Sequence, residues 1–461
     1  MEQGVSFDLD LIRRYDQSGP RYTSYPTAVE FDESFDEAAY QTACARSNES
    51  GRPLSIYFHL PFCDTVCFYC ACNKIATKDR SLVQPYLERV YRELEMQSAL
   101  FDRSRQVEQL HWGGGTPTFL NNAQMIELME VTRRHFTLAG DDVGEFSIEI
   151  DPREADAASI KVLRQIGFNR MSLGVQDFDP RVQTAVNRIQ TEEQTMAVLN
   201  AALAEGFRSI SIDLIYGLPF QSVESFSKTL ERVIAVNPQR LSIFNYAHLP
   251  ERFKPQRRIN DADLPAPEVK LDILQSTIAR LTEAGYVYIG MDHFARPDDE
   301  LALAQQAGTL YRNFQGYSTH ADCDLIGIGV TSIGKVDNTY GQNRRGLDEY
   351  YADIDAGHLA VFRGIELNRD DLIRRDIITQ LICHFGLDMR AAEARWGIQF
   401  ADYFADSLEK LQGMAEDGLV EITADEIRIL APGRLLVRNI CMAFDAYLAA
   451  KTGPIGFSKV I

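Results

Sequence analysis

Four cysteines crowded into one short segment are the part of this sequence best suited to chemistry. Cys63, Cys67 and Cys70 follow a C-x3-C-x2-C spacing, and Cys72 comes two positions later. Cysteine thiolates are the usual ligands of iron–sulfur clusters, so three of them can hold three irons of a [4Fe–4S] cluster. The fourth iron would stay open to a small molecule, which is an arrangement for catalysis rather than for electron transfer alone.

Two other interpretations of these cysteines stay open. Cys72 could complete a structural four-cysteine zinc site, although Cys70 and Cys72 are close together for that geometry. Cys67 and Cys70 also match the C-x-x-C spacing of thioredoxin-like redox sites, although the extra Cys63 disfavours it. The other cysteines are interpreted as ordinary thiols: Cys44, Cys323, Cys383 and Cys441.

A run of glycines is the second chemical signal. Residues 111–118 read HWGGGTPT, which is neither a Walker A loop nor G-x-G-x-x-G. Glycines let backbone groups approach a ligand without interference from a Cβ atom. The alternative is a simple tight turn.

Both signals directly follow apolar runs that alternate with amphipathic helical patterns. The β-rich runs are residues 54–60, 107–112, 146–150, 170–175, 210–216 and 241–247. Helical periodicity follows each run, beginning near Ser81 and ending with residues 269–284. Six strand–helix units predict parallel strands joined by right-handed crossovers. Because a closed barrel needs eight, we expect a partial, open (β/α)6 barrel with its active site at the carboxyl ends of the strands.

The flanking segments predict additional parts. Residues 18–27 contain two prolines and predict an extended or turning segment. Residues 286–291 and 325–333 could be further strands or closing segments. The expected domains are an N-terminal arm at 1–50, the barrel at 51–290, a barrel extension at 291–366 and a helical C-terminal domain at 367–461.

The C-terminal domain has a winged-helix-like pattern. Helices begin at Arg369, a small hairpin covers residues 420–429, and a last helix runs over about 433–449. Because the chain is acidic and shows no basic recognition helix, we expect a packing or lid domain rather than a DNA-binding one.

Composition excludes several classes of protein. The 461 residues include 45% hydrophobic and 25% charged residues, which is the balance of a globular chain. The net charge of −19 opposes binding to nucleic acid or to anionic lipid. No apolar run approaches the ~20 residues of a membrane span, and the N-terminus lacks the apolar core of a signal peptide. We therefore expect a cytoplasmic protein without membrane insertion.

The cysteine spacing after the first strand resembles that of the radical S-adenosylmethionine superfamily. Within it, the chain resembles the oxygen-independent coproporphyrinogen III oxidase (dehydrogenase) family over nearly its whole length, to the C-terminal residues 457–461. The segments that carry this likeness are GPRYTSYPT at 19–27, YFHLPFC at 57–63, CACNK at 70–74, IDLIYGLP at 212–219 and GMDHFA at 290–295.

The resemblance implies an oxidoreductase of porphyrin and haem biosynthesis that works without oxygen. Coproporphyrinogen III would lose two propionate carboxyl groups to give protoporphyrinogen IX. S-adenosylmethionine bound at the open iron would supply a 5′-deoxyadenosyl radical that takes a hydrogen atom from the substrate. The expected partners are the substrate and an electron donor such as flavodoxin or ferredoxin, and we expect a monomer. No conventional acid–base pair is needed for the C–H step.

The resemblance also assigns site residues. Cys63, Cys67 and Cys70 would hold the cluster, and Tyr69 would pack beside the adenine. The first S-adenosylmethionine would be contacted by Tyr57, Gly114, Glu149 and Ile333. A second molecule near the first would be contacted by Gly115, Thr116, Gln176, Arg188, Asp213 and Ala247.

The chemistry of some of these residues also suggests a role, independently of the resemblance. Asp213 interrupts an apolar run, so its carboxylate needs a ribose hydroxyl, a sulfonium, Arg188 or a backbone contact. Arg188 could equally be a helix-surface arginine. His59 and Cys72 are catalytic candidates: His59 beside the sulfurs or substrate, Cys72 at the second cofactor or in hydrogen transfer, against simple packing.

The substrate carries four carboxylates, so an acidic protein needs local cations or polar groups to bind it. Arg21 on the extended arm and Gln315 are candidates for this contact, and Tyr25 is a candidate to shield the radical. The alternative is an arm that only packs against the barrel.

The main rival function is that of a haem chaperone with the same barrel and cluster motif. Such relatives typically lack the Cys-x-Cys end and the Tyr-Thr-Ser-Tyr-Pro arm, and they carry His-Asn-x-x-Tyr-Trp where this chain has RNFQGY at 312–317. These differences favour the enzyme. A zinc scaffold with a winged-helix tail is the third hypothesis.

Overall fold

The computed structural model describes residues 4–140, 143–450, 457 and 459. Its contacts divide the chain into two compact units. Unit 1 comprises Met1–Val29, Pro267–Ala321 and Leu367–Ile461, and unit 2 comprises Glu30–Ala266 and Asp322–Glu366. The domain boundaries predicted from the sequence stay predictions. Within the described ranges, no helix has the length and apolar character needed to cross a membrane.

Unit 2 is built on strands that run parallel to one another. They follow the order β9-β8-β7-β6-β4-β1, and all neighbouring pairs in this series are parallel. The bounds are β1 Leu54–Leu60, β4 Gln106–Gly114, β6 Glu145–Ile150, β7 Arg170–Gln176, β8 Ser209–Tyr216 and β9 Arg240–Asn245. The series does not close on itself, so the predicted open (β/α)6 barrel is confirmed.

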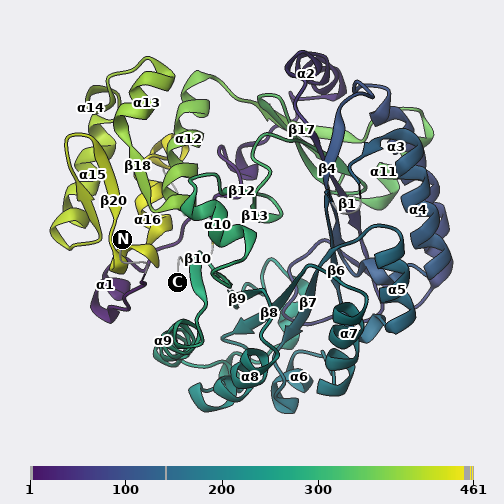
Figure 1. Ribbon diagram of the computed structural model, residues 1–461, viewed down its shortest axis with the longest axis horizontal. Coiled ribbons are helices and arrows are strands. Elements are labelled where there is room, and N and C mark those ends of the chain that lie inside the picture. The colour runs from purple at the N-terminus through teal and green to yellow at the C-terminus, as the bar shows by residue number, and fades with distance from the viewer. Residues whose placement is uncertain (1–3, 141–142, 451–456, 458, 460–461) are drawn as a thin grey trace. The chain divides into compact units, whose positions relative to one another are not determined.

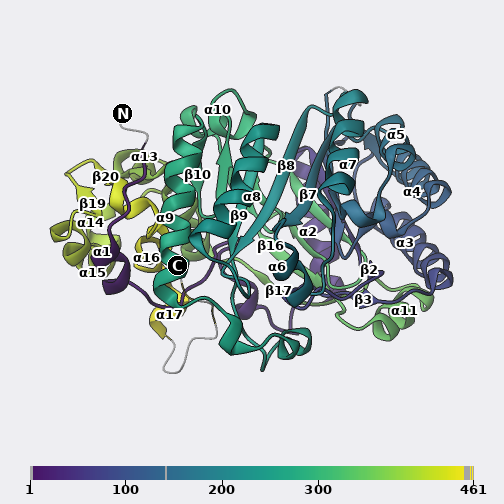
Figure 2. The same cartoon turned by 90° about the horizontal axis from the view of Figure 1, so that it is seen from below.

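Helices cover the outer side of these strands, as a parallel sheet with crossover connections requires. Figure 1 shows α3, α4, α5 and α7 along that side, and α7 and α8 again lie beside the strands in Figure 2. Their bounds are α2 Glu37–Ser50, α3 Val83–Ser98, α4 Asn122–His135, α5 Ala157–Gln165, α6 Pro180–Ala185, α7 Glu192–Ala204 and α8 Val223–Val236. Trp112 is fully buried and packs edge-on against Phe58 and Phe168, which places the core between strands and helices.

A second set of strands extends the sheet beyond β1. β14 (Asp324–Ile328) pairs with β1 in parallel, and β15 (Ile333–Val336), β16 (Thr339–Asn343) and β17 (Val361–Glu366) continue antiparallel. Of the two alternatives for residues 325–333, the structure shows strands: the run covers most of β14, a turn and the first residue of β15. The chain turns between these strands at Gly329 and Thr331, which have φ of 94° and 65° and so cannot continue a strand. Short pairs complete unit 2: β2 (Phe62–Cys63) with β3 (Ile75–Ala76), and β5 (Thr137–Leu138) with β4; helix α11 spans Leu347–Asp355.

Unit 1 is mostly helical, as expected for the C-terminal domain. Its helices are α1 Leu9–Arg14, α9 Pro267–Glu283, α10 Glu300–Gln306, α12 Arg369–His384, α13 Met389–Trp396, α14 Phe400–Tyr403, α15 Ala405–Glu416, α16 Val437–Met442 and α17 Ala446–Ala450. Its strands are β10 Val287–Gly290, β11 His293–Ala295, β12 Tyr311–Asn313, β13 Gly316–Ser318, β18 Gly386–Asp388, β19 Val420–Ile422 and β20 Glu426–Ile429. The predicted hairpin is β19–β20, and β18 joins it as a third strand.

The single helix predicted at 433–449 is wrong. The chain there forms a 3-10 helix at Ala431–Arg434, then α16 and α17. Asp445 explains the last break because its carboxylate accepts the backbone N–H groups of Tyr447 and Leu448 at 3.0 and 3.1 Å, which begins a new helix.

Residues 18–27 belong to unit 1 and form the turning alternative of the prediction, with bends at residues 23–26 and a left-handed φ of 46° at Tyr22. Tyr22 and Tyr25 are buried there. The Tyr22 hydroxyl donates to Asp445 at 2.8 Å, and the Tyr25 hydroxyl accepts the Ala446 N–H at 3.1 Å. The arm is thus part of the core of this unit.

Candidate active site

Most of the predicted site residues of unit 2 line one pocket at the carboxyl ends of the parallel strands. The pocket has a volume of about 330 Å³. Of the predicted residues, it is lined by Cys63, Cys67, Tyr69, Cys70, Cys72, Gly114, Gly115, Thr116, Glu149, Gln176, Arg188 and Asp213. Tyr57, His59, Ala247 and Ile333 belong to the same unit but do not line this pocket.

The cysteine loop presents its sulfur atoms to this pocket beside cationic groups. Cys67 Sγ lies 3.4 Å from an Arg153 nitrogen and 3.5 Å from an Arg188 nitrogen. The Thr116 hydroxyl donates to Cys63 Sγ at 3.5 Å. Guanidinium and hydroxyl donors stabilise negative charge on sulfur. Three thiols that share one pocket with such donors fit the ligand set of an anionic iron–sulfur cluster.

The thiols differ in acidity before any metal binds. Burial raises the pKa of Cys63 to about 11. The pKa of Cys70 is lowered, first by a hydrogen bond from the Cys72 thiol and also by the charge of Lys74. Cys72 is exposed and lies at the same pocket, so the structure gives it a contact with Cys70 while its catalytic role stays a prediction.

The three glycines are needed for close packing around the loop. A Cβ atom on Gly115 would lie 2.6 Å from the backbone of Pro61 and Phe62, and one on Gly114 would lie 2.7 Å from the His59 ring. Gly115 N–H donates to Leu60 O at 2.8 Å. The glycine run therefore holds the end of β4 against the start of the cysteine loop, a closer approach than a simple tight turn requires.

Glu149 is an ionised carboxylate at the end of β6. It accepts the Gly114 N–H at 3.1 Å and lies 3.4 Å from His111 Nε2. Burial alone would raise its pKa, but the hydrogen bond and charge of His111 and the Gly114 N–H outweigh burial, so the pKa is lowered. Such a carboxylate suits an ammonium group.

His59 sits beside the pocket rather than in its lining. Its Nδ1 lies 3.1 Å from the Tyr57 hydroxyl and its Nε2 lies 3.0 Å from Asn73 O. Burial lowers the pKa of His59, so the ring is neutral with Nε2–H donating to the carbonyl. Tyr57 stacks on His111 with ring centroids 5.8 Å apart. His59 thus contacts Tyr57 and, at Asn73, the cysteine loop. The roles predicted for His59 and Tyr57 toward cofactor and substrate stay predictions.

Arg188 is a buried member of an ion-pair network. One of its terminal nitrogens lies 2.9 Å from Asp151 Oδ2, and the other donates to Gly174 O at 2.5 Å. Arg153 shares Asp151 at 2.6 Å. The alternative of a surface arginine is therefore wrong, and so is the suggested pairing with Asp213.

Asp213 receives hydroxyl groups instead of a cation. The Ser172 hydroxyl donates to its Oδ2 at 2.6 Å. Burial raises the pKa of Asp213 to about 6, and hydrogen bonds from Ser172, Ser242 and Ser211 limit the rise. Gln176, at the end of β7, adopts a left-handed backbone conformation with φ of 69°. A positively charged or hydroxyl-bearing ligand would therefore stabilise the ionised form of the Asp213 carboxylate.

The chain is similar to known proteins over nearly its whole length. Residues 57–233 match the Radical SAM superfamily, and residues 367–436 match the HemN C-terminal domain. The oxygen-independent coproporphyrinogen III oxidase of Pseudomonas aeruginosa is 55% identical over 457 residues, with 99% of each chain covered. That of Escherichia coli strain K12 is 54% identical over 459 residues, covering 100% of this chain and 99% of the relative.

This chain belongs to the oxygen-independent coproporphyrinogen III oxidase family of the radical SAM superfamily. A solved structure described as coproporphyrinogen III oxidase (HemN) from Escherichia coli, a radical SAM enzyme, superposes with a TM-score of 0.92 at 53% identity, covering 96% of this chain and 100% of that one. The family resemblance and the assignment as an oxidoreductase are confirmed. The superfamily uses a [4Fe–4S] cluster and S-adenosylmethionine, which agrees with the donor set of the pocket.

The substrate candidates of unit 1 lie in three different settings. Arg21 forms an ion pair with Asp292. Tyr25 is buried against Ala446, as described above. Gln315 lies in the β12–β13 hairpin, where its backbone N–H donates to Asn313 Oδ1 at 2.9 Å. Their contact with substrate stays a prediction.

Sequence reasoning missed several residues of the pocket: Thr65, Lys74, Ile150, Asp151, Arg153, Ser172, Gly174 and Phe244. Asp151 and Arg153 directly follow β6, so the rule that chemistry gathers after parallel strands could have found them. No signal in the sequence marks Ser172 as a partner of Asp213.

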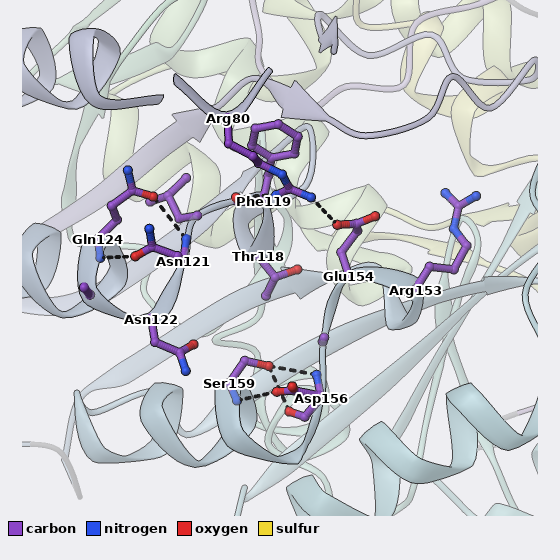
Figure 3. Close-up of a pocket in the computed structure, with 13 residues that line it drawn as sticks. Arg80, Thr118, Phe119, Asn121, Asn122, Gln124, Arg153, Glu154, Asp156 and Ser159 are labelled. Atoms are coloured by element: carbon purple, nitrogen blue, oxygen red, sulfur yellow. Dashed lines mark hydrogen bonds and ion pairs between the residues drawn. The ribbon is translucent and has the colours of Figure 1, made fainter. Parts of the chain in front are cut away.

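A larger pocket of about 760 Å³ adjoins this site in unit 2. Figure 3 shows Arg80 pairing with Glu154 across it, at 2.8 Å, and the helix caps formed by Asn121 and Asp156. Arg80 also covers the Phe119 ring at 3.6 Å. Arg153 lines both pockets and contacts Cys67 Sγ.

Proposed function

We propose that this enzyme converts coproporphyrinogen III to protoporphyrinogen IX by oxidative decarboxylation of two propionate groups, with two S-adenosylmethionine molecules at one [4Fe–4S] centre. The observation that carries the proposal is the shared pocket of Cys63, Cys67 and Cys70 in a chain 55% identical, over nearly its full length, to an enzyme of that name. When bound, the reduced cluster and S-adenosylmethionine supply a carbon-centred radical that removes a hydrogen atom from the substrate.

The residues of the chain bind and orient. Cys63, Cys67 and Cys70 would hold three irons, while Arg153 and Arg188 offset negative charge at Cys67. The Gly114 and Glu149 pair would receive the amino-acid part of the first S-adenosylmethionine. No side chain has to move a proton for a C–H abstraction.

Two separate carboxylates support the second cofactor molecule. Glu149 and Asp213 both line the pocket, on strands β6 and β8. Their pKa values are shifted in opposite directions, because Glu149 has His111 as a partner and Asp213 has only hydroxyl donors. Each can serve a different cationic ligand. A one-electron donor such as flavodoxin or ferredoxin would reduce the cluster.

The test is an anaerobic assay with coproporphyrinogen III, dithionite and S-adenosylmethionine, with product and 5′-deoxyadenosine measured together. We expect protoporphyrinogen IX to form with 5′-deoxyadenosine. Absence of product from protein that holds about four irons would refute the proposal. Tight stoichiometric haem binding in that case would indicate a chaperone, and zinc in place of iron would indicate a scaffold.

A further inference from the structure

One buried side chain connects the cysteine loop to the segment that follows β9. Gln256 lies in the 3-10 helix Lys254–Arg258 and is 1% exposed. Its Nε2 donates to Tyr69 O at 3.0 Å and to Ala247 O at 3.2 Å. Its Oε1 accepts the Leu249 N–H at 2.6 Å. Both N–H groups of the carboxamide are therefore used, each on a different backbone segment.

The two segments have related predicted tasks. Tyr69 lies between Cys67 and Cys70 and lines the cofactor pocket. Ala247 is a predicted contact of the second S-adenosylmethionine. Under the proposed function, on which this inference rests, Gln256 joins the cluster loop to a cofactor-binding segment.

Other contacts hold the loop on both sides of Tyr69. On the amino side, the Asn187 amide donates to Val66 O at 2.8 Å, and the Phe68 N–H donates to Val186 O at 2.9 Å. On the carboxyl side, the Cys70 N–H donates to Cys67 O at 3.2 Å and Lys74 Nζ donates to Cys70 O at 3.0 Å. Tyr69 O belongs to the peptide unit that leads directly into Cys70. This peptide unit is held at both ends, by Gln256 at its carbonyl and by Cys67 O at the Cys70 N–H, and its orientation sets the direction from which Cys70 Sγ reaches the pocket.

We propose that Gln256 is a positioning residue that sets the Cys70 ligand and links cluster retention to S-adenosylmethionine binding. Loss of its two donors leaves two carbonyls without this partner and removes the hydrogen bond at the carbonyl end of the peptide before Cys70. Residues that orient metal ligands in this way typically change metal affinity 10- to 100-fold when altered.

Gln256→Glu tests the proposal because it keeps an oxygen for the Leu249 N–H and removes both donors. The assay uses the anaerobically reconstituted full chain and follows loss of iron to an excess of chelator. We expect iron release about tenfold faster than in the parent protein. We also expect weaker S-adenosylmethionine binding, measured by the change it causes in the electron paramagnetic resonance spectrum of the reduced cluster.

Gln305→Glu is the matched control. Gln305 in unit 1 donates its Nε2 to two backbone carbonyls in the same way, those of Ile289 at 2.6 Å and Cys383 at 2.8 Å. We expect this variant to release iron at the parental rate. Equal acceleration in both variants would assign the effect to general destabilisation and overturn the proposal, and so would parental behaviour of Gln256→Glu.

If the charged variant does not fold, Gln256→Met repeats the comparison without charge. Failure of both variants to fold would make Gln256 a residue of general stability and overturn the proposal. The iron-release assay contains no porphyrinogen. A parent protein that holds its cluster but forms no product would therefore refute the proposed function and leave this test intact.

Discussion

The raised pKa of Asp213 predicts that its ionised carboxylate lowers the stability of the folded protein when no cofactor is bound. Burial raises its pKa from 3.8 to about 6 in the folded protein. Between these two pH values the folded state holds the proton more tightly than the unfolded state. Stability therefore falls as pH rises through this window and stays low above it.

The size of the effect follows from the shift. Each unit of pKa corresponds to about 1.4 kcal/mol, so the ionised carboxylate lowers the free energy of unfolding by about 3 kcal/mol at pH 8. At pH 5 the same group is mostly protonated in the folded state, and the deficit is about half as large. Asp213→Asn removes the charge and keeps an oxygen for the Ser172 hydroxyl.

We expect Asp213→Asn, without S-adenosylmethionine, to unfold at higher temperature than the parent at pH 8. The gain should shrink at pH 5. Thermal unfolding followed by circular dichroism at both pH values measures this, with Asp402→Asn at an exposed position as the control. A variant less stable than the parent at pH 8, or a gain that grows at pH 5, would refute the reasoning. S-adenosylmethionine binding should weaken in the same variant.

Three further outcomes are expected. Serine in place of Cys63, Cys67 or Cys70 should remove the brown colour and the iron, whereas Cys72→Ser should keep both, as measured by iron analysis. An active Cys63, Cys67 or Cys70 variant that holds a full complement of iron would contradict the ligand assignment. Gly115→Ala should prevent cluster assembly, because the alanine Cβ would lie 2.6 Å from the backbone before Cys63. Reconstitution of the variant with the parental iron content would show that the cysteine loop shifts to accommodate the added methyl group. Arg21→Ala should raise the KM for coproporphyrinogen III about tenfold and leave the yield of cluster unchanged, since a charge-assisted contact contributes about 1.5–3 kcal/mol; an unchanged KM would remove Arg21 from the substrate site.

The sequence predicts the barrel well because its strands carry their own signal. Leu54–Leu60 matches β1 residue for residue, and the strands β4, β6 and β8 bring Gly114, Glu149 and Asp213 to the pocket. Spacing and strand order are local properties of the chain. They are enough to bring the cysteines and rim residues together.

Partners that come from distant parts of the chain are not predictable in this way. Nothing near Arg188 in the sequence indicates that Asp151, rather than Asp213, is its counter-ion. Tyr22 and Tyr25 carry no apolar periodicity, yet they are buried by contacts with Asp445 and Ala446. The break before α17 likewise depends on the Asp445 side chain rather than on helix propensity.

The burial of the arm has a consequence for how the protein is made. The hydrogen bond from Tyr22 to Asp445 spans 423 positions, and the bond from the Ala446 N–H to the Tyr25 hydroxyl spans 421. Ribosomes add roughly 5–20 residues per second, so the arm waits on the order of half a minute for the residues that cover it. During that time its tyrosines are open to solvent and to chaperones. Unit 2, whose strands from β1 to β9 emerge in sequence, can begin to assemble meanwhile. Completion of unit 1 is thus a late event of synthesis, tied to the last helices of the chain.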